Sequence, residues 1–218
     1  MALTLHSMWR ATAPYRVRIG LNLKGLSYGY VGIDLVGGEA RRAPYTGLNR
    51  QGLVPALTTD DGVLTQSLAI LEWLEETHPE PPLLPKAPMD RARVRAMAEI
   101  VACDIHPLNN LRVLQALNGL GHKFGSPDQT EWIHRWIGSG FDTIEPMIAE
   151  LGGGFCFGDT PGFADCCLVP QVYSAERYGL DLGPYPAIQA VAAKAAEHPA
   201  FAAAHPDRQP DATHPPAG

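Results

Sequence analysis

Three kinds of side chain in this sequence could bind anions or move protons. Arginine has a planar guanidinium that pairs with both oxygens of a carboxylate, and Arg10, Arg112 and Arg177 are the candidates. The imidazole of His106 can donate or accept a proton near neutral pH. Ser67 stands where a helix is expected to begin, so its hydroxyl and the nearby amides can hold a carboxylate.

Each of these residues also has a plainer interpretation. Ser67 could simply cap its helix, and His106 lies near an apolar stripe, where it could be a satisfied core histidine. Each arginine could be a surface residue. Arg112 follows His106 by six positions and so lies about 240° from it around the axis of an ideal helix, so both face one cleft only if Pro107 distorts that helix. Residue types alone leave both interpretations open.

The cysteines and histidines do not form a metal-binding pattern. The sequence has no C-x-x-C pair and no H-E-x-x-H spacing. We therefore expect no metal site, and we expect buried free thiols in a reducing cytosol. The four cysteines are Cys103, Cys156, Cys166 and Cys167.

The composition is that of a globular chain with enough apolar residues for a core. The chain has 218 residues, 45% of them hydrophobic, and 17 Lys and Arg against 23 Asp and Glu. It has no basic run, no apolar stretch of about 18 residues, and no basic segment followed by an apolar one at its start. We therefore expect no nucleic-acid partner, no membrane association and no signal peptide.

The hydrophobic pattern changes near residue 85. Before that point, the first three elements predict a β-α-β unit with parallel strands, and a later hairpin adds an antiparallel pair. A segment at 39–47 is expected to be irregular. The expected elements are a strand at 3–6, a helix at 14–24, a strand at 28–33, a hairpin at 54–57 and 63–64, and a helix at 67–77.

Five prolines between residues 77 and 88 predict a stiff linker that no helix can cross. Beyond it we find no convincing strand. Residues 206–218 are rich in proline and polar residues and are expected to fray. The predicted architecture is a small mixed α/β domain followed by an all-helical domain. Long helices are indicated around 94–108, 132–137, 164–175 and 185–197, the third with a kink at Pro170.

Short segments spread over nearly the whole chain carry a family signature. They are Leu5–Arg10, Tyr15–Ile19, Asn22–Gly25, Leu48–Asn49, Val54–Leu57, Gln66–Ile70, Trp73–Glu76, Leu83–Pro85, Asp104–Asn110, Gly158–Asp159, Ala164–Asp165, Leu168–Val172, Asp181–Leu182, Pro184–Pro186 and Gln209–Asp211. They resemble zeta-class glutathione transferases, and most of all the bacterial glutathione-dependent maleylpyruvate isomerases. The resemblance implies a thioredoxin-like glutathione-binding domain over 1–80 and an all-helical domain with the substrate site over 89–210.

Glutathione is the cofactor that this resemblance implies. Val54 and a cis Pro55 would offer backbone to the peptide-like ligand, in the manner of an added strand. Gln66 and Ser67 would face the γ-glutamyl end of glutathione. Its sulfur would lie at the start of the first helix, near residues 11–14, where the positive end of the helix lowers the pKa of a thiol.

The chain departs from the family at two places in this predicted site. Where the family usually has Ser-Ser-Cys-Ser, this chain has Ala11-Thr12-Ala13-Pro14, and Thr12 is the only hydroxyl among the four. We therefore assign the thiolate contact to Thr12, with an N-cap threonine as the alternative. The glutamine that the family places before Val-Pro is Leu53 here, and Gln51 or Asn49 could replace it.

The resemblance also implies a reaction, the cis–trans isomerisation of maleylpyruvate or maleylacetoacetate in the breakdown of aromatic compounds. The glutathione thiolate would add to the conjugated carbon, the bond would rotate in the enolate, and the thiolate would leave unchanged. Arginine suits the developing charge and the carboxylates. The resemblance implies catalytic roles for Arg10, Thr12, His106 and Arg177. His106 would touch glutathione or the substrate. Arg10, Arg177, Arg112 and Asn110 would contact the maleyl diacid.

Two other functions remain open from the sequence. The chain could be a zeta-like transferase or dehalogenase that acts on another electrophile, or a glutathione-binding scaffold without chemistry, as Ala11 and Ala13 would allow. The family implies a homodimer, and we expect a cytoplasmic protein. Asp165 is interpreted as a structural residue that holds the start of a buried helix, with Gly162 in the capping position.

Overall fold

A four-stranded sheet forms the base of the N-terminal part of the computed structural model, which describes residues 2–212. The strand order is β2-β1-β3-β4, with β1 parallel to β2 and antiparallel to β3, and with β3 antiparallel to β4. The predicted β-α-β unit with a following hairpin is therefore confirmed. The strands are β1 (Thr4–Ser7), β2 (Gly29–Gly32), β3 (Ala56–Thr59) and β4 (Gly62–Thr65).

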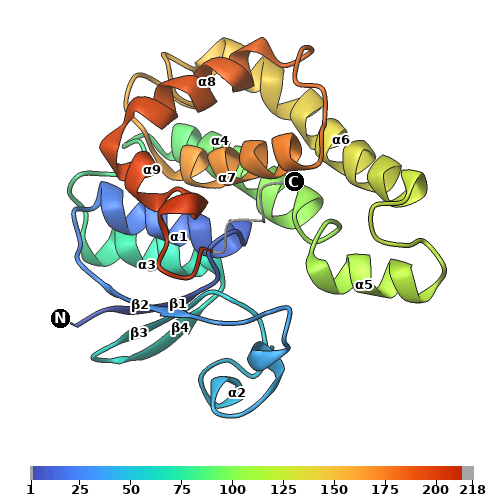
Figure 1. The fold of residues 1–218 in the computed structure, drawn as a ribbon. Coiled ribbons are helices and arrows are strands. Elements are labelled where there is room, and N and C mark those ends of the chain that lie inside the picture. Colours follow the sequence, from blue (N-terminus) through green and yellow to red (C-terminus); the bar gives the residue numbers. More distant parts are fainter. Residues whose placement is uncertain (1, 213–218) are drawn as a thin grey trace. The chain divides into compact units, whose positions relative to one another are not determined.

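Two helices, α1 (Thr12–Leu23) and α3 (Ser67–Thr77), lie together on one face of this sheet (Figure 1). They approach closely at Gly20, because a side chain there would collide with Leu71. The apolar side chains between the helices and the sheet supply the hydrophobic stabilisation of this layer. The fully buried apolar residues of these strands and helices are Leu5, Val17, Ile19, Leu21, Leu57, Ile70, Leu71 and Leu74.

The segment between β2 and β3 is more ordered than predicted. It contains the 3₁₀ turn η1 (Glu39–Arg41) and the short helix α2 (Tyr45–Leu48), where the sequence predicted irregular structure over 39–47. One turn of helix is too short to show a hydrophobic period. Buried Tyr45 holds the segment, since its hydroxyl donates to the Leu53 carbonyl at 2.6 Å. Burial raises the pKa of Tyr45 to about 12, so this donor stays protonated.

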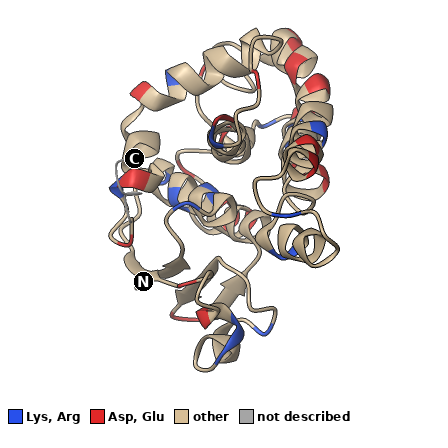
Figure 2. Cartoon of the chain, turned by 45° about the vertical axis from the view of Figure 1, so that its right-hand side comes forward, with Lys and Arg blue, Asp and Glu red and all other residues tan. Residues whose placement is uncertain are grey.

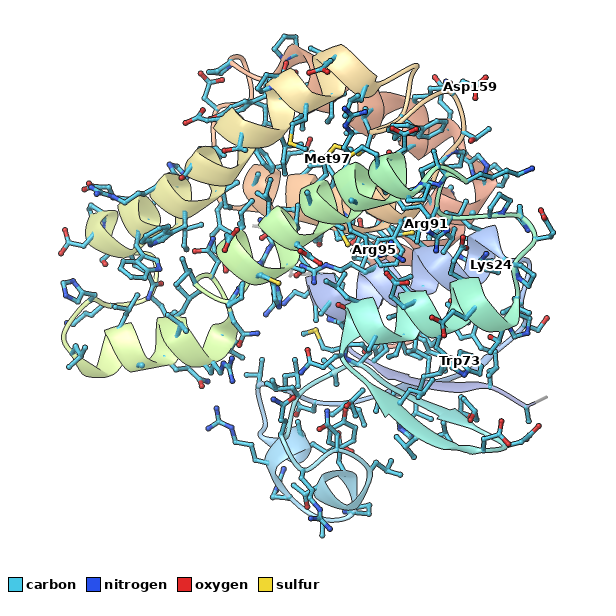
Figure 3. All side chains as sticks on the ribbon, turned by 180° about the vertical axis from the view of Figure 1, so that it is seen from behind. Lys24, Trp73, Arg91, Arg95, Met97 and Asp159 are labelled. Atoms are coloured by element: carbon cyan, nitrogen blue, oxygen red, sulfur yellow. The ribbon has the colours of Figure 1, made fainter. Side chains whose placement is uncertain are left out.

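Helices make up the regular structure described between residues 84 and 196. They are α4 (Pro88–Glu99), the π-helical η2 (Ile100–Ile105), α5 (Leu111–Gly119), α6 (Pro127–Leu151), α7 (Phe163–Arg177) and α8 (Pro186–Glu197). On α4, the apolar side chains of Val94 and Met97 are buried, each 2% exposed. Figure 3 shows Met97 on one side of α4 and Arg91 and Arg95 on the other. Basic and acidic residues are interspersed along the helices (Figure 2).

Packing divides the chain into two compact units. The first comprises the described residues up to Leu83 together with those from Glu197 onward, and the second is Leu84–Ala196. The division therefore places α9 (Pro199–Ala204) with the first unit, where it packs on α1. The domain bounds of 1–80 and 89–210 stay a prediction. No helix in the described part of the chain is long and apolar enough to cross a membrane.

The predicted fraying near the C-terminus is wrong for residues 206–212. This segment contains the 3₁₀ turn η3 (Pro206–Arg208), and Gln209 is only 8% exposed. The Gln209 amide donates to the carbonyls of Ala203 and His205, at 3.0 and 2.8 Å. Such contacts hold polar residues in place, and composition does not reveal them. Residues 213–218 lie outside the described residues.

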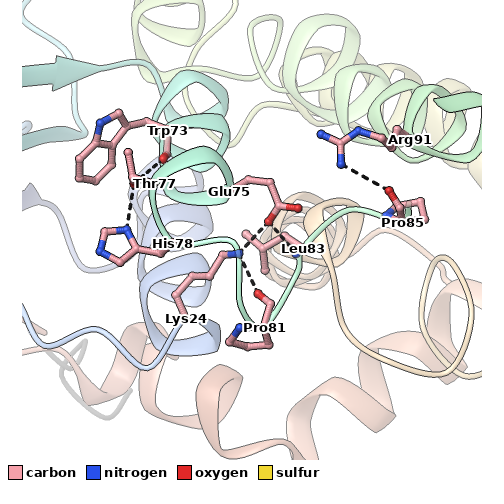
Figure 4. Close-up of polar contacts among 9 residues, drawn as sticks. All are labelled: Lys24, Trp73, Glu75, Thr77, His78, Pro81, Leu83, Pro85 and Arg91. Carbon is pink, nitrogen blue, oxygen red and sulfur yellow. Dashed lines mark hydrogen bonds and ion pairs between the residues drawn. The ribbon is translucent and has the colours of Figure 1, made fainter. Parts of the chain in front are cut away.

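A buried ion pair ties the end of the first unit to its helices (Figure 4). Lys24 Nζ donates to Glu75 Oε2 and to the Pro81 carbonyl, each at 2.7 Å. The same carboxylate oxygen accepts the Leu83 N–H at 2.8 Å. Lys24 and Glu75 pair with each other, and each of them also bonds one backbone group of the proline-rich segment. This network therefore fixes that segment where it leaves α3.

Candidate functional site

The start of α1 is the first part of the predicted glutathione site. The N-cap residue Ala11 has extended backbone angles, and no side chain caps this end of the helix. The first amides of a helix have no acceptor within it, and the helix dipole makes this end positive. Thr12 is the first helical residue and is only 7% exposed. This end of α1 can therefore hold a thiolate.

The start of α3 is a second uncapped helix end in the same unit. Gln66 is the N-cap residue, with a left-handed φ of 69° and no side-chain cap. The expectation that Ser67 is the cap is therefore wrong by one residue. Ser67 begins the helix and is 6% exposed, whereas Gln66 is exposed. A left-handed φ is unusual outside glycine, and such strain is typical of ligand-binding positions.

The peptide bond between Val54 and Pro55 is cis, as the family resemblance implied. It directly precedes β3, whose residue Ala56 pairs with His6 of β1. Val54 is half-buried and Pro55 is buried, and the resemblance assigns the backbone of this segment to peptide binding in the manner of an added strand.

Gln51 and Asn49 differ in the structure, although both were candidates to replace the missing family glutamine. Asn49 is buried, and its amide donates to the Leu53 carbonyl at 2.7 Å while its oxygen accepts the Gln51 N–H. Its side chain thus shapes the loop. Exposed Gln51 instead accepts a hydrogen bond from Gln66 Nε2 at 2.6 Å. Of the two candidates, Gln51 is therefore the one that contacts Gln66, which is predicted to bind glutathione.

Arg10 belongs to the first unit and precedes α1. It is exposed, and its guanidinium carbon lies 5.5 Å from the centroid of the Trp9 ring. This stacking supports the arginine from one side while its donors stay open to solvent. Arg10 and Thr12 are thus separated by a single residue at the start of α1.

The remaining predicted residues lie in the second unit, where the π-helical segment ends at His106. Pro107 follows, and a new helix, α5, begins at Leu111 with Asn110 as its N-cap. Asn110 Oδ1 accepts the Arg112 N–H at 3.1 Å, and Asn110 Nδ2 lies 3.5 Å from His106 Nε2. The structure thus brings His106 and Asn110 together. The estimate of 240° on one helix does not apply, because His106 and Arg112 lie on different helices.

A residue of this loop that we did not predict also has a notable environment. Asn109 has a buried side-chain oxygen and a buried side-chain nitrogen without a hydrogen-bond partner among the described residues. Burying an unsatisfied amide costs about 1–3 kcal/mol per group. Such a group is a candidate for a ligand or water contact. Asn109 belongs to the family-like segment Asp104–Asn110, but that pattern does not reveal unsatisfied atoms.

Arg177 is the last residue of α7 and is exposed. Its guanidinium carbon lies 4.4 Å from the centroid of the Tyr178 ring. Arg10 and Arg177 therefore share one arrangement, a solvent-facing guanidinium stacked on an aromatic neighbour. A ring in this position limits the orientations of the guanidinium.

Asp165 has the structural role that we expected. It is 2% exposed, and its two oxygens accept the N–H groups of Cys156 and Gly162, each at 2.8 Å. Gly162 has no side chain for a reciprocal bond, so the carboxylate alone holds the start of α7. Burial raises the pKa of Asp165, while the two amide donors act in the opposite direction. Burial and the Asp165 carboxylate also raise the pKa of the Cys156 thiol, which stays neutral.

Comparison with known proteins decides the family. The model of the glutathione S-transferase N-terminal domain matches residues 13–82, and the model of the C-terminal domain matches residues 130–203. The chain belongs to the glutathione S-transferase family. It is 50% identical over 210 residues to the maleylacetoacetate isomerase of Pseudomonas aeruginosa, covering 95% of this chain and 97% of that protein.

Solved structures of the same family match this chain over nearly their whole length. A holo structure described as maleyl pyruvate isomerase, a bacterial glutathione S-transferase in the zeta class, has a TM-score of 0.92 and 48% identity, covering 96% of this chain and all of that one. Maleylacetoacetate isomerase from Anaeromyxobacter dehalogenans, with glutathione in its active site, has a TM-score of 0.88 and 45% identity. Its coverage is 97% of this chain and 98% of that one. The thioredoxin-like plus all-helical architecture is confirmed.

Proposed function

We propose that this zeta-class transferase is a glutathione-dependent cis–trans isomerase that converts maleylpyruvate or maleylacetoacetate to its fumaryl isomer. The observation that carries the proposal is the pair of uncapped helix starts, at Ala11 and Gln66, in the same unit as the cis Val54–Pro55 bond. Each of the two helix starts can bind an anion, and the backbone at Val54 can pair with an extended peptide. Glutathione has a thiolate, a γ-glutamyl carboxylate and a peptide backbone, so the residues fit it.

Glutathione, when bound, supplies a thiolate that adds reversibly to the conjugated double bond and so allows that bond to rotate. Amides at the start of α1 and the Thr12 hydroxyl stabilise the sulfur's negative charge. Gln66, Ser67 and the first amides of α3 hold the γ-glutamyl carboxylate, and Val54 binds the peptide backbone. Gln51 supports Gln66 through their hydrogen bond.

The arginines are the proposed contacts of the substrate. Arg10 and Arg177 pair with its carboxylates and stabilise the charge that develops on its conjugated oxygen. His106 exchanges a proton with that oxygen, and Asn110 orients the imidazole from 3.5 Å. Arg112, on the first turn of α5, adds positive charge near this loop. Each of these roles is assigned from residue chemistry and from the family resemblance.

We also propose that the enzyme acts as a cytoplasmic homodimer. None of the four cysteines forms a disulfide, which suits a reducing compartment, and three of them are buried as expected, whereas Cys103 is exposed, so the expectation of burial is wrong for that residue. Sedimentation of the purified protein would test the dimer, which predicts a mass near twice that of the chain.

The reaction is tested by incubating the purified protein with maleylpyruvate, or separately with maleylacetoacetate, in the presence and absence of glutathione. The proposal predicts loss of the cis compound and appearance of the fumaryl isomer only with glutathione, whose concentration does not change. Consumption of glutathione or release of halide from other electrophiles would instead indicate a transferase or dehalogenase. Glutathione binding without turnover of either maleyl compound would indicate a scaffold. The ratio of the two kcat/KM values identifies the preferred substrate.

The Thr12→Ala variant tests the thiolate assignment, with Thr143→Ala on the exposed face of α6 as the control. We expect Thr12→Ala to raise the pKa of bound glutathione's thiol and to lower kcat by about 10-fold, as loss of one hydrogen bond to a charged group would. The control is expected to match the wild type. A Thr12→Ala enzyme with unchanged kcat would assign activation to the backbone amides alone.

A further inference from the structure

The peptide groups of Trp9 are held on both sides, immediately before Arg10. The Trp9 N–H donates to Asp211 Oδ2 at 3.1 Å. The Trp9 carbonyl accepts from Arg18 Nη2 at 2.8 Å. The turn that leads from β1 into α1 is therefore fixed by Arg18 of α1 and by Asp211, which lies 202 positions after Trp9.

Arg18 links three segments of the first unit. It is completely buried, and besides Trp9 it donates to Ser7 Oγ at 3.1 Å and to the Ala204 carbonyl at 3.0 Å. Its guanidinium carbon also lies 5.0 Å from the centroid of the Tyr15 ring. A guanidinium has five donors in a rigid fork, so it can set the end of β1, the following turn and α9 relative to one another.

Asp211 is itself held in place. Its Oδ1 accepts from the Tyr30 hydroxyl of β2 at 2.5 Å, which leaves Oδ2 for the Trp9 amide. Gly32 makes room for this carboxylate, because a Cβ there would lie 3.0 Å from Asp211 Cβ. The two hydrogen bonds of Gln209 shape the turn that delivers Asp211 to this position.

We propose that Asp211 and Arg18 are positioning residues for the isomerase reaction, and that they act by clamping the Trp9 peptide. The clamp fixes where Arg10 points and where the amides at the start of α1 lie. Those two features are the proposed substrate contact and the proposed thiolate contact, so this inference rests on the proposed function. A displacement of about 1 Å in such groups can lower a rate by about 100-fold.

Asp211→Asn is the first variant to measure, because it keeps the shape of the side chain but removes its charge. With maleylpyruvate and saturating glutathione we expect kcat/KM to fall by about 10- to 100-fold. The Kd of glutathione should change by less than about 3-fold, since the γ-glutamyl contacts at α3 are untouched. Asp207→Asn is the matched control, because Asp207 lies in the same segment and its side chain is 56% exposed. Its carboxylate lies 3.7 Å from His205 Nδ1, which is outside the clamp. The control should match the wild type.

Tyr30→Phe provides a second route if Asp211→Asn folds poorly. It removes only the hydroxyl that holds Asp211 Oδ1, so we expect a smaller loss of kcat/KM. The double variant should lose less than the product of the two single effects, because both act through one clamp. A purely stabilising network would lower the melting temperature of these variants but leave kcat and KM of the folded enzyme unchanged, and that result would overturn the proposal.

A readout without the maleyl substrate separates this inference from the proposed function. The ultraviolet absorbance of the glutathione thiolate, titrated on the enzyme, gives the pKa of the bound thiol. We expect Asp211→Asn to raise that pKa relative to the wild type and to Asp207→Asn. If neither maleyl compound is turned over but the thiol pKa rises, the proposed function fails while the clamp stands. An unchanged thiol pKa together with unchanged kinetics would overturn the clamp.

Discussion

Arg16 Nη1 lies 3.2 Å from Ser67 Oγ, so a buried guanidinium of α1 reaches the first residue of α3. Arginine can only donate, so the serine oxygen must accept this hydrogen bond. The hydroxyl proton of Ser67 is then left to donate to another acceptor. The pair thus links the body of α1 to the first residue of α3.

Ser67→Ala is expected to weaken glutathione binding by about 10- to 100-fold, since a hydrogen bond to a charged group contributes about 1.5–3 kcal/mol. Isothermal titration calorimetry measures this Kd. Ser139→Ala, at an exposed position of α6, is the matched control and should bind as the wild type does. Equal affinity of the Ser67→Ala and wild-type proteins would show that the serine only begins the helix.

Arg10→Gln should raise KM for the maleyl substrate and lower kcat/KM by about 10- to 100-fold, because the carboxylate loses a charged, forked partner. Arg10→Lys should recover only part of this loss, since an ammonium cannot form two parallel bonds. The control is Arg135→Gln, whose guanidinium forms an exposed pair with Glu131 at 3.2 Å. If Arg10→Gln retains the kinetics of the control, Arg10 is a surface arginine.

Asp165→Ala should lower the free energy of unfolding by about 1–3 kcal/mol for each of the two backbone amides that it leaves unsatisfied, at Cys156 and Gly162. Urea denaturation measures the change. Asp159→Ala, at an exposed position outside this network, should be nearly neutral. A structural role further predicts that the folded Asp165→Ala enzyme keeps the wild-type KM, and a selective rise in KM would contradict it.

His6 gives the stability of the first unit a dependence on pH. Burial lowers the pKa of His6, whose Nε2 lies 3.1 Å from Thr58 Oγ1. The unfolded chain therefore takes up the proton first, at about pH 6.5, and stability falls as the pH drops from there through the lower folded-state pKa. His6→Gln should make the loss of stability between pH 7 and pH 5 less steep.

Two measurements check this sign. Denaturation midpoints of His6→Gln and wild type across that pH range give the difference in slope, while the other histidines cancel in the comparison. The imidazole resonance of His6 should titrate below pH 6.5 in the folded protein. A His6 resonance that titrates at or above 6.5, with parallel stability profiles, would contradict the prediction.

The sequence by itself determined the elements with long or regular patterns. The helix over residues 67–77 was predicted to within one residue, since Ser67 is its first residue and not its cap, and the alternating strands with their turn indicated the mixed sheet, because amphipathic periodicity is a local property. The short helices α5 and α9 lack a pattern long enough to predict them. The family segments indicated the cis bond before Pro55, which local propensity alone does not.

Only the tertiary structure decided which polar residues meet. Asn49 and Gln51 were equivalent candidates in the sequence, yet one is buried against the Leu53 carbonyl and the other pairs with Gln66. The π-helical segment and the break after His106 placed Arg112 on a separate helix. Asp211 contacts Trp9 across 202 positions. Hydrogen bonds between distant segments depend on how the elements pack, and no local pattern contains that information.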